Sequence, residues 1–177
     1  MRIIGISGVW SYDNPVWINL RKAFLREFPG ARMVIEEESG CNPWEIRRLQ
    51  DFADRLVRKY DDGTETLIVG HSMGGVIACA VADQFTRSAV RGIVSIYAPH
   101  HFFGGSFSRR LDAPARPEVP IISFQARYDE VVWWGTRHKH TVEHTLLDSS
   151  HQTSLVANEK LAQKIAEITR RRFFPEA

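Results

Sequence analysis

The stretch Gly70-His71-Ser72-Met73-Gly74 is the most informative part of this chain for its fold. It has the pattern G-x-S-x-G, and the residues on either side define its setting. Residues 66–69, Thr-Leu-Ile-Val, form a short apolar run that is typical of a buried strand. Residues 76–82 are rich in alanine and contain no helix breaker, which favours a buried helix. A strand, a tight turn with glycines and a helix together predict that Ser72 stands at the tip of a sharp turn as a nucleophile.

The rest of the chain alternates short apolar runs with amphipathic segments. Five further strands are expected, at residues 3–6, 32–35, 90–97, 119–124 and 142–147. Helices are expected at residues 15–28, 42–60 and 153–173, and from the serine turn to about residue 87, because apolar residues recur there at helical spacing. Six short apolar strands alternating with helices predict an α/β fold. We expect a three-layer sandwich in which a mostly parallel sheet has helices on both faces.

Composition is that of an ordinary soluble globular protein. The chain has 177 residues, a net charge of +2, 44% hydrophobic residues and 25% charged residues, enough for one sizeable core. Basic residues are spread along the chain without interleaved aromatics, so no nucleic-acid partner is expected. The sequence predicts neither a signal peptide nor a membrane-spanning segment. Cys41 and Cys79 fall in different expected elements, which favours a reduced, cytoplasmic setting.

Three residues at strand ends form a candidate catalytic set. A parallel sheet places its chemistry at the carboxyl ends of its strands. Ser72 follows the third expected strand, Asp129 the fifth and His151 the sixth. A serine nucleophile needs a histidine base, and the histidine needs a carboxylate to fix its tautomer. The chain order serine, acid, histidine is the one expected when the serine stands on such a turn.

Position along the chain selects His151 among seven histidines. His71 adjoins the nucleophile, but on a sharp turn the neighbouring side chain points elsewhere. The other five follow the fourth expected strand or lie before or within the last: His100, His101, His138, His140 and His144. For the acid, Asp148 is the rival of Asp129, but only two residues separate it from His151.

The negative charge that develops on the substrate oxygen also needs hydrogen-bond donors. One is expected to be the backbone N–H of Met73, at the start of a helix. The other is expected after the first strand, where Gly8 permits close approach; Val9 is the candidate and Trp10 the alternative. Aromatic side chains are candidates for the wall of an acyl-binding pocket, chiefly Trp10, Phe102 and Trp133.

Neither a metal nor a cofactor is expected. His100 and His101 are adjacent, and His138 and His140 are expected on one face of a strand, but no carboxylate stands at ligand spacing from either pair. Solvated histidines are therefore the expectation at both places. Gly104-Gly105 lacks the lysine and the following helix of a phosphate-binding loop.

The stretch Gly70-His71-Ser72-Met73-Gly74-Gly75, with Asp129 and His151 downstream, resembles the α/β-hydrolase superfamily, and the resemblance covers essentially the whole chain. The sequence G-H-S-M-G-G is common among its lipases and esterases. The length resembles that of minimal bacterial lipases and small serine hydrolases. That likeness implies a sheet of strand order 2-1-3-4-5-6 and a single domain, residues 1–177, without a separate cap domain. Many members carry His-Gly after the first strand, where this chain has Ser7-Gly8.

This resemblance implies an ester hydrolase that forms an acyl-enzyme on Ser72 and acts on a small-molecule acyl ester. A thioesterase or acyltransferase would use the same three residues. A non-catalytic binding protein on a hydrolase scaffold is the alternative of another class, because common folds host unrelated functions. The acyl length, the choice between ester and thioester, and the oligomeric state stay open.

Overall fold

The structure is a computed structural model that describes residues 1–8, 15–38, 45–100, 118–132, 137–151, 155 and 158–175. Its centre is a sheet of six strands, β1 (Arg2–Ile6), β2 (Arg32–Glu36), β3 (Thr66–His71), β4 (Val90–Ile96), β5 (Ile121–Tyr128) and β6 (Thr141–Ser150). The strands lie in the order β2-β1-β3-β4-β5-β6, which confirms the expected order. All five neighbouring pairs are parallel, so the sheet is wholly rather than mostly parallel.

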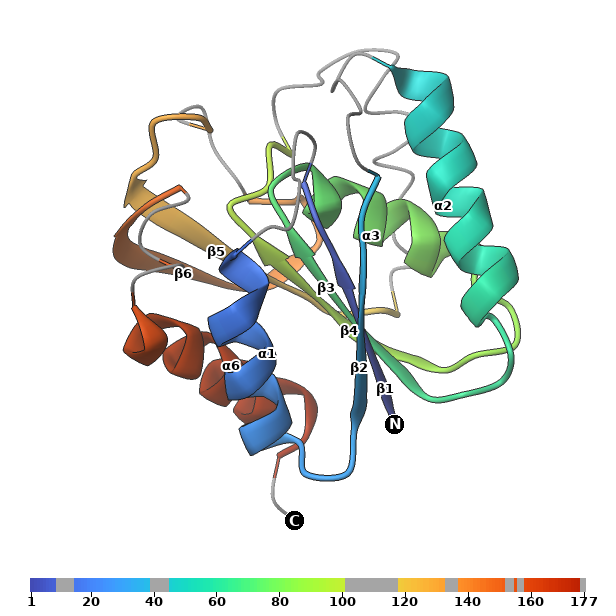
Figure 1. The fold of residues 1–177 in the computed structure, drawn as a ribbon, viewed down its shortest axis with the longest axis horizontal. Helices are drawn as coiled ribbons and strands as arrows, with labels where there is room; N and C mark the ends of the chain where they lie inside the picture. The colour runs from blue at the N-terminus through green and yellow to red at the C-terminus, as the bar shows by residue number, and fades with distance from the viewer. Residues whose placement is uncertain are drawn as a thin grey trace.

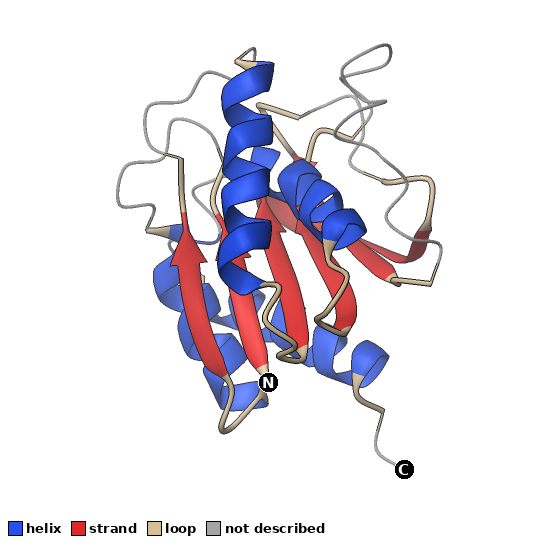
Figure 2. Cartoon of the chain, turned by 90° about the vertical axis from the view of Figure 1, so that its right-hand side faces the viewer, coloured by secondary structure: helices blue, strands red, loops and turns tan. Residues whose placement is uncertain are grey.

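Helices cover both faces of the sheet, as expected (Figures 1 and 2). Helices α1 (Val16–Glu27) and α6 (Glu159–Phe173) lie on one face, and α2 (Ile46–Tyr60) and α3 (Met73–Gln84) lie on the other. In the part of the chain that the structure describes, none of the helices is long and apolar enough to cross a membrane.

The central strands carry apolar side chains on both faces. Ile3 and its neighbour Ile4 are both fully buried and belong to separate clusters. The cluster under α1 and α6 includes Ile3, Leu67, Val94, Phe24 and Ile165. The cluster under α2 and α3 includes Ile4, Ile68, Ile93, Leu49 and Val76. Burial on both faces is what turns these strands into continuous apolar runs in the sequence, and it explains why they could be predicted.

Several elements end elsewhere than the sequence predicts. Strands β5 and β6 run on to Tyr128 and Ser150, because their backbones keep pairing after the apolar pattern has stopped at exposed residues. Strand β4 ends one residue early, since Tyr97 has a φ of 53°. Helix α6 begins six residues later than expected, where the Asn158 side chain accepts a hydrogen bond from the N–H of Leu161 and caps the helix.

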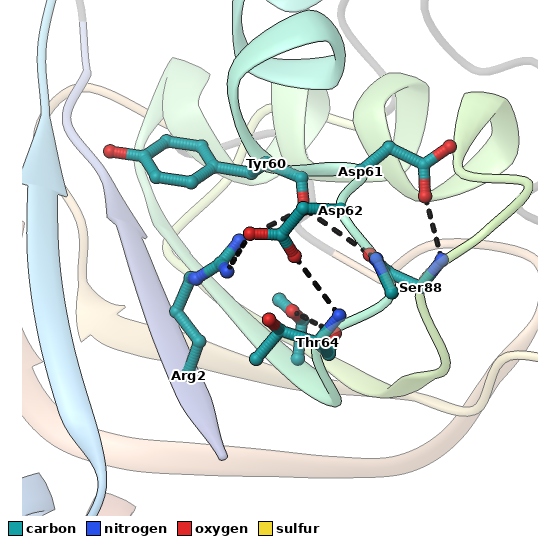
Figure 3. Close-up of polar contacts among 8 residues, drawn as sticks. Arg2, Tyr60, Asp61, Asp62, Thr64 and Ser88 are labelled. Atoms are coloured by element: carbon teal, nitrogen blue, oxygen red, sulfur yellow. Dashed lines mark hydrogen bonds and ion pairs between the residues drawn. The ribbon is translucent and has the colours of Figure 1, made fainter.

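A polar cluster holds the amino-terminal end of the sheet together (Figure 3). Asp61, just after α2, accepts hydrogen bonds from the backbone N–H groups of residues 86, 87 and 88 at 2.8, 2.9 and 2.6 Å. The Thr86 hydroxyl donates a further bond at 3.0 Å. Arg2 of β1 donates to the Tyr60 carbonyl at 2.9 Å and to Asp62 at 2.6 Å. These contacts tie β1, the end of α2 and the turn before β4 to one another.

The Asp61→Asn variant is expected to be less stable by about 1–2 kcal/mol, because an amide nitrogen cannot accept the bonds that one carboxylate oxygen accepts. Burial raises the pKa of Asp61, but the hydrogen bonds from residues 86–88 outweigh it and hold the pKa far below its ordinary value. A carboxyl group with a lowered folded-state pKa stabilises the protein above its unfolded-state pKa, about 4, and loses that contribution as the pH falls.

Urea unfolding of both proteins near pH 7 and near pH 3 measures this contribution. The difference in the free energy of unfolding between the wild type and the variant should be smaller at the lower pH. Asp51→Asn, which changes an exposed carboxylate on α2, serves as the control and should move the midpoint little. A gap that stays equal at both pH values would show that the Asp61 carboxylate does not stabilise the fold through its charge.

Candidate active site

Ser72 stands on a sharp, strained turn between β3 and α3. Its φ of 54° and ψ of −130° lie outside the regions that a side chain with a Cβ ordinarily adopts. Such a conformation costs about 1–3 kcal/mol and persists only where the surroundings enforce it. Here the Ser72 N–H donates to the Ile96 carbonyl at 2.8 Å, and the Gly75 N–H donates to the Ser72 carbonyl at 2.9 Å. The turn therefore places Ser72 at the carboxyl end of the sheet.

Two glycines allow this turn to close. A Cβ added at Gly74 would lie 2.7 Å from the carbonyl carbon of Ile6 and closer still to its oxygen. A Cβ added at Gly70 would lie 2.5 Å from the Cα of Gly75. The start of α3 thus packs directly on the backbone of β1 and of β3, and only glycine leaves room for that approach.

The segment after β1 begins in contact with Ser72. A Cβ added at Gly8 would lie 2.8 Å from the Ser72 Cβ and 3.2 Å from its Oγ. Ser7, which stands where many α/β-hydrolases carry histidine, is buried, and its Oγ accepts a hydrogen bond of 2.6 Å from Trp17 Nε1. Serine at position 7 therefore still ties the end of β1 to α1 through a hydrogen bond, and Gly8 lies beside the candidate nucleophile.

Asp129 and His151 form a buried pair. Asp129 follows the last residue of β5, and His151 follows the last residue of β6. The Nδ1 of His151 lies 2.9 Å from both carboxylate oxygens of Asp129. The side chain of His151 is only 1% exposed and that of Asp129 only 2%. The backbone N–H groups of Val131 and Val132 donate to Oδ1 of the same carboxylate at 2.9 and 2.5 Å.

The surroundings of Asp129 favour its ionised form. Burial raises its pKa, but the hydrogen bond from His151 and those from the Val132 and Val131 N–H groups outweigh burial, so the pKa lies below its ordinary value. An ionised carboxylate accepts hydrogen bonds and donates none, so the proton between the two residues belongs to His151 Nδ1. The other ring nitrogen, Nε2, is then the one that can take up a proton.

His71 lies against this pair, a contact that the sequence did not indicate. Its ring centroid is 5.4 Å from that of His151, and its Nε2 is 3.4 Å from the His151 carbonyl oxygen. Burial, followed by the nearby His151, lowers the pKa of His71 to about 3. His71 is therefore neutral at neutral pH. Because it directly precedes Ser72, its contact with His151 joins the turn that carries Ser72 to the end of β6.

Tyr97 and Glu130 are two further neighbours of His151 that chain order could not identify. The Tyr97 ring lies 5.9 Å from the His151 ring, and its hydroxyl is 2.7 Å from the Ser149 Oγ. The Glu130 carboxylate accepts a hydrogen bond of 3.1 Å from the His151 N–H. Position was the available signal: Tyr97 ends the strand expected at residues 90–97, and Glu130 directly follows the candidate acid, Asp129.

The expectation that the remaining histidines are solvated is wrong for His100 and His138. Both are buried, with His100 Nε2 2.7 Å from the Ser95 Oγ and the His100 and His138 rings 5.1 Å apart. His138 and His140 precede β6 rather than share a strand face, and the His140 N–H donates to His138 Nδ1 at 3.2 Å. The turns after β4 and before β6 pack together, and this tertiary contact leaves no trace in local sequence. Within the described ranges, no three potential ligands are grouped to hold a metal ion.

The structure brings some of the expected site residues together and leaves others unplaced. Ser72, Asp129 and His151 all stand at the carboxyl ends of strands, and Met73 is the first residue of α3. Val9, Trp10, Phe102 and Trp133 lie outside the described residues. Among the residues described, no hydrogen bond joins the Ser72 hydroxyl to His151; such bonds are often long in unliganded enzymes and tighten when substrate binds.

Comparisons with known proteins point to one fold. Residues 35–111, which include the serine turn, match the family described as alpha/beta hydrolase fold. An esterase domain from a Rhodothermus marinus protein is 18% identical, with 97% of this chain and 87% of that chain covered and a TM-score of 0.62. A methylesterase protein from Arabidopsis is 12% identical, with 98% and 99% covered and a TM-score of 0.67. No curated protein sequence matches the chain.

A third similar structure is an extracellular alpha/beta-hydrolase from a Paenibacillus species, which is 15% identical, with 98% of this chain and 99% of that chain covered and a TM-score of 0.64. The strand order, the helices on both faces and these matches agree. The chain has the α/β-hydrolase fold.

Proposed function

We propose that this protein is a serine hydrolase that cleaves carboxylic esters through an acyl-enzyme on Ser72. The observation that carries the proposal is the buried contact of His151 with Asp129 at the same sheet end as a serine on a strained turn. A histidine held by a carboxylate is the base that a serine hydroxyl needs in order to attack a carbonyl.

The proposed reaction has two halves, acylation of Ser72 and hydrolysis of the acyl-enzyme. Ser72 Oγ attacks the carbonyl carbon of the ester, its proton passes to His151 Nε2, and a tetrahedral intermediate with a negative oxygen forms. The intermediate collapses, the bond to the alcohol oxygen breaks, and that oxygen takes the proton from His151. A water molecule then attacks the acyl-enzyme in the same way, and the acid leaves as Ser72 regains its proton. Asp129 stabilises the protonated imidazole in both halves.

Backbone donors are proposed for the negative oxygen of the intermediate. The Met73 N–H lies in the first turn of α3, where N–H groups lack partners within the helix and the helix dipole favours negative charge. Val9 is proposed for the second donor, with Trp10 as the alternative, and the contact of Gly8 with Ser72 supports a donor in this segment. Trp10, Phe102 and Trp133 stay predicted pocket residues. The single domain without a cap and the cytoplasmic location also stay predictions.

Labelling with a fluorophosphonate probe, followed by peptide mass mapping, tests the proposal. An activated serine displaces fluoride from the probe and forms a stable phosphonate ester, so we expect one adduct on Ser72 in the wild type. The Ser72→Ala variant should give none, whereas Ser88→Ala, just before the start of β4 at the opposite end of the sheet, should label as the wild type does. A folded wild-type protein without an adduct on Ser72 would contradict the proposal and favour a non-catalytic binding protein.

Kinetics with the unlabelled wild-type protein then measure the substrate class. Hydrolysis of p-nitrophenyl esters should exceed hydrolysis of matched acyl thioesters in kcat/KM. The reverse ratio would assign thioesterase chemistry to the same three residues. Transfer of the acyl group to an added alcohol in preference to water would assign acyltransferase chemistry.

A further inference from the structure

We propose that His71 and Tyr97 are positioning residues that hold His151 in place for proton transfer with Ser72. This inference rests on the proposed function. The three rings contact one another in a triangle: His71 to His151 at 5.4 Å, Tyr97 to His151 at 5.9 Å and His71 to Tyr97 at 6.1 Å. All three residues are at most 1% exposed, so the general base stands in a closed aromatic setting.

His71 holds the main chain of the base. Its Nε2 donates to the His151 carbonyl at 3.4 Å, and a carbonyl oxygen only accepts, so the proton of the neutral His71 ring belongs to Nε2. At the other end of the same residue, the His151 N–H donates to Glu130. Both backbone groups of His151 are therefore fixed from outside its own strand. Because His71 precedes Ser72 directly, this bond links the nucleophile's turn to the base without any contact between the two reacting side chains.

Tyr97 holds the ring of the base and the strand before it. Its hydroxyl bonds to Ser149, two residues before His151, at 2.7 Å, and its ring lies 5.9 Å from the imidazole, tilted by 45°. Tyr97 reaches this place only by taking a φ of 53°, a left-handed conformation that is costly for a bulky residue. Ser72 and Tyr97 are the non-glycine residues with positive φ in the described ranges, and they end the adjacent strands β3 and β4. Backbone strain of this kind gathers where function requires a fixed geometry.

The two positioning residues also stay uncharged while the base changes its charge. Burial lowers the pKa of His71 to about 3 and raises the pKa of Tyr97 to about 12. Over the pH range in which a histidine base works, neither ring therefore gains or loses a proton. Among the described residues, the Asp129 carboxylate contacts the His151 ring and the Glu130 carboxylate contacts its backbone N–H, and neither positioning residue adds a charge beside them.

The first experiment compares two replacements of His71 that differ in one donor. In His71→Gln the side-chain amide can place an N–H close to the position of the imidazole Nε2, whereas in His71→Leu the side chain fills the space without a donor. For hydrolysis of a p-nitrophenyl ester, we expect His71→Leu to lower kcat by about 10- to 100-fold with little change in KM, since a misplaced catalytic group slows the chemical step. His71→Gln should recover most of that loss.

The second experiment isolates the Tyr97 hydroxyl. Tyr97→Phe and Ser149→Ala each remove one partner of the same hydrogen bond, and each should lower kcat by about tenfold. Because both act through one contact, the double variant should be no slower than either single variant. The rate of fluorophosphonate labelling of Ser72 should fall in parallel with kcat in every variant.

Thermal unfolding separates positioning from a merely structural role. If His71→Leu and Tyr97→Phe lower the melting temperature but label Ser72 at the wild-type rate while folded, the inference is overturned. Equal loss in His71→Gln and His71→Leu would also overturn it for His71, and independent losses in the Tyr97 and Ser149 variants would overturn it for Tyr97. If His71→Leu does not fold, the kcat and labelling rates of His71→Gln and Tyr97→Phe test the inference instead. A wild type that gives no adduct on Ser72 refutes the proposed function instead, so the two failures are distinguishable.

Discussion

Ester hydrolysis by the Asp129→Asn variant is expected to be about 10⁴-fold slower in kcat than hydrolysis by the wild type, with the fold intact. The reason is a change of tautomer. A base that carries its proton on the wrong nitrogen cannot accept the proton of the serine hydroxyl.

The contacts of Asp129 decide how the asparagine side chain will lie. The N–H groups of Val131 and Val132 both point at Oδ1, and a donor needs an acceptor. The amide oxygen of asparagine must therefore occupy that position, which leaves the amide nitrogen in the place of Oδ2, beside His151 Nδ1. His151 Nδ1 lies 2.9 Å from both positions. The amide oxygen already accepts from two backbone N–H groups and the amide nitrogen can only donate, so the tautomer with the ring proton on Nε2 is favoured. His151 Nε2, which should accept the proton of the Ser72 hydroxyl, then already carries a proton.

Steady-state kinetics with a p-nitrophenyl ester measure the effect, and circular dichroism confirms the fold. Asp148→Asn is the matched control, because Asp148 is the rival acid by sequence. Its side chain is 78% exposed and lies 3.5 Å from Arg127, so we expect a change in kcat of no more than about twofold. Loss of activity in Asp148→Asn with little loss in Asp129→Asn would mean that Asp148, not Asp129, is the acid.

The Gly74→Ala variant is expected to be destabilised by about 3 kcal/mol or more, a large part of the 5–15 kcal/mol that holds an ordinary domain together. The added Cβ would meet the backbone of Ile6 and the carbonyl oxygen of Ser7 at 2.7 Å or less. Backbone atoms of a central strand cannot move aside as a flexible side chain can. Either α3 shifts away from β1, which opens the turn that carries Ser72, or the sheet itself distorts.

Urea unfolding measures this loss of stability, and fluorophosphonate labelling reports on the turn. Ala80→Gly, in the same helix and also buried, is the matched control, for which helix propensity predicts a loss of about 1 kcal/mol. Gly74→Ala should lose clearly more stability than the control and label Ser72 far more slowly. If the two variants were equally stable, the close packing of α3 on β1 would not be what requires glycine at position 74.

Much of the fold could be predicted because burial on both faces leaves a strong local pattern. Strands β1, β3 and β4 each contain a short run of buried apolar residues, so their sequences alone predicted them. Asp129 and His151 could be placed side by side by topology, since parallel strands bring their carboxyl ends to one edge. The structure places them 2.9 Å apart. Their catalytic role with Ser72 stays a prediction until the labelling and the variants are measured.

Other features could not be predicted, because contacts between distant segments decide them. The burial of His100 depends on the turn before β6, about forty residues away in the chain. The contact of His71 with the His151 carbonyl depends on how two strand ends meet, and nothing in the stretch G-H-S-M-G encodes it. The ends of β5 and β6 were missed because backbone pairing, not side-chain burial, continues these strands.

The order in which the strands join the sheet bears on how the protein is made. After β2 and β1 pair, strands β3, β4, β5 and β6 are each added to the same growing edge in the order in which the ribosome produces them. A nascent chain can therefore extend its sheet strand by strand, as domains that fold from the amino terminus during translation do. Until β6 emerges, the edge of β5 is open to chaperones or to other nascent chains. His151, which follows β6, is synthesised after Ser72 and Asp129, so the proposed base is the last of the three candidate catalytic residues to be made.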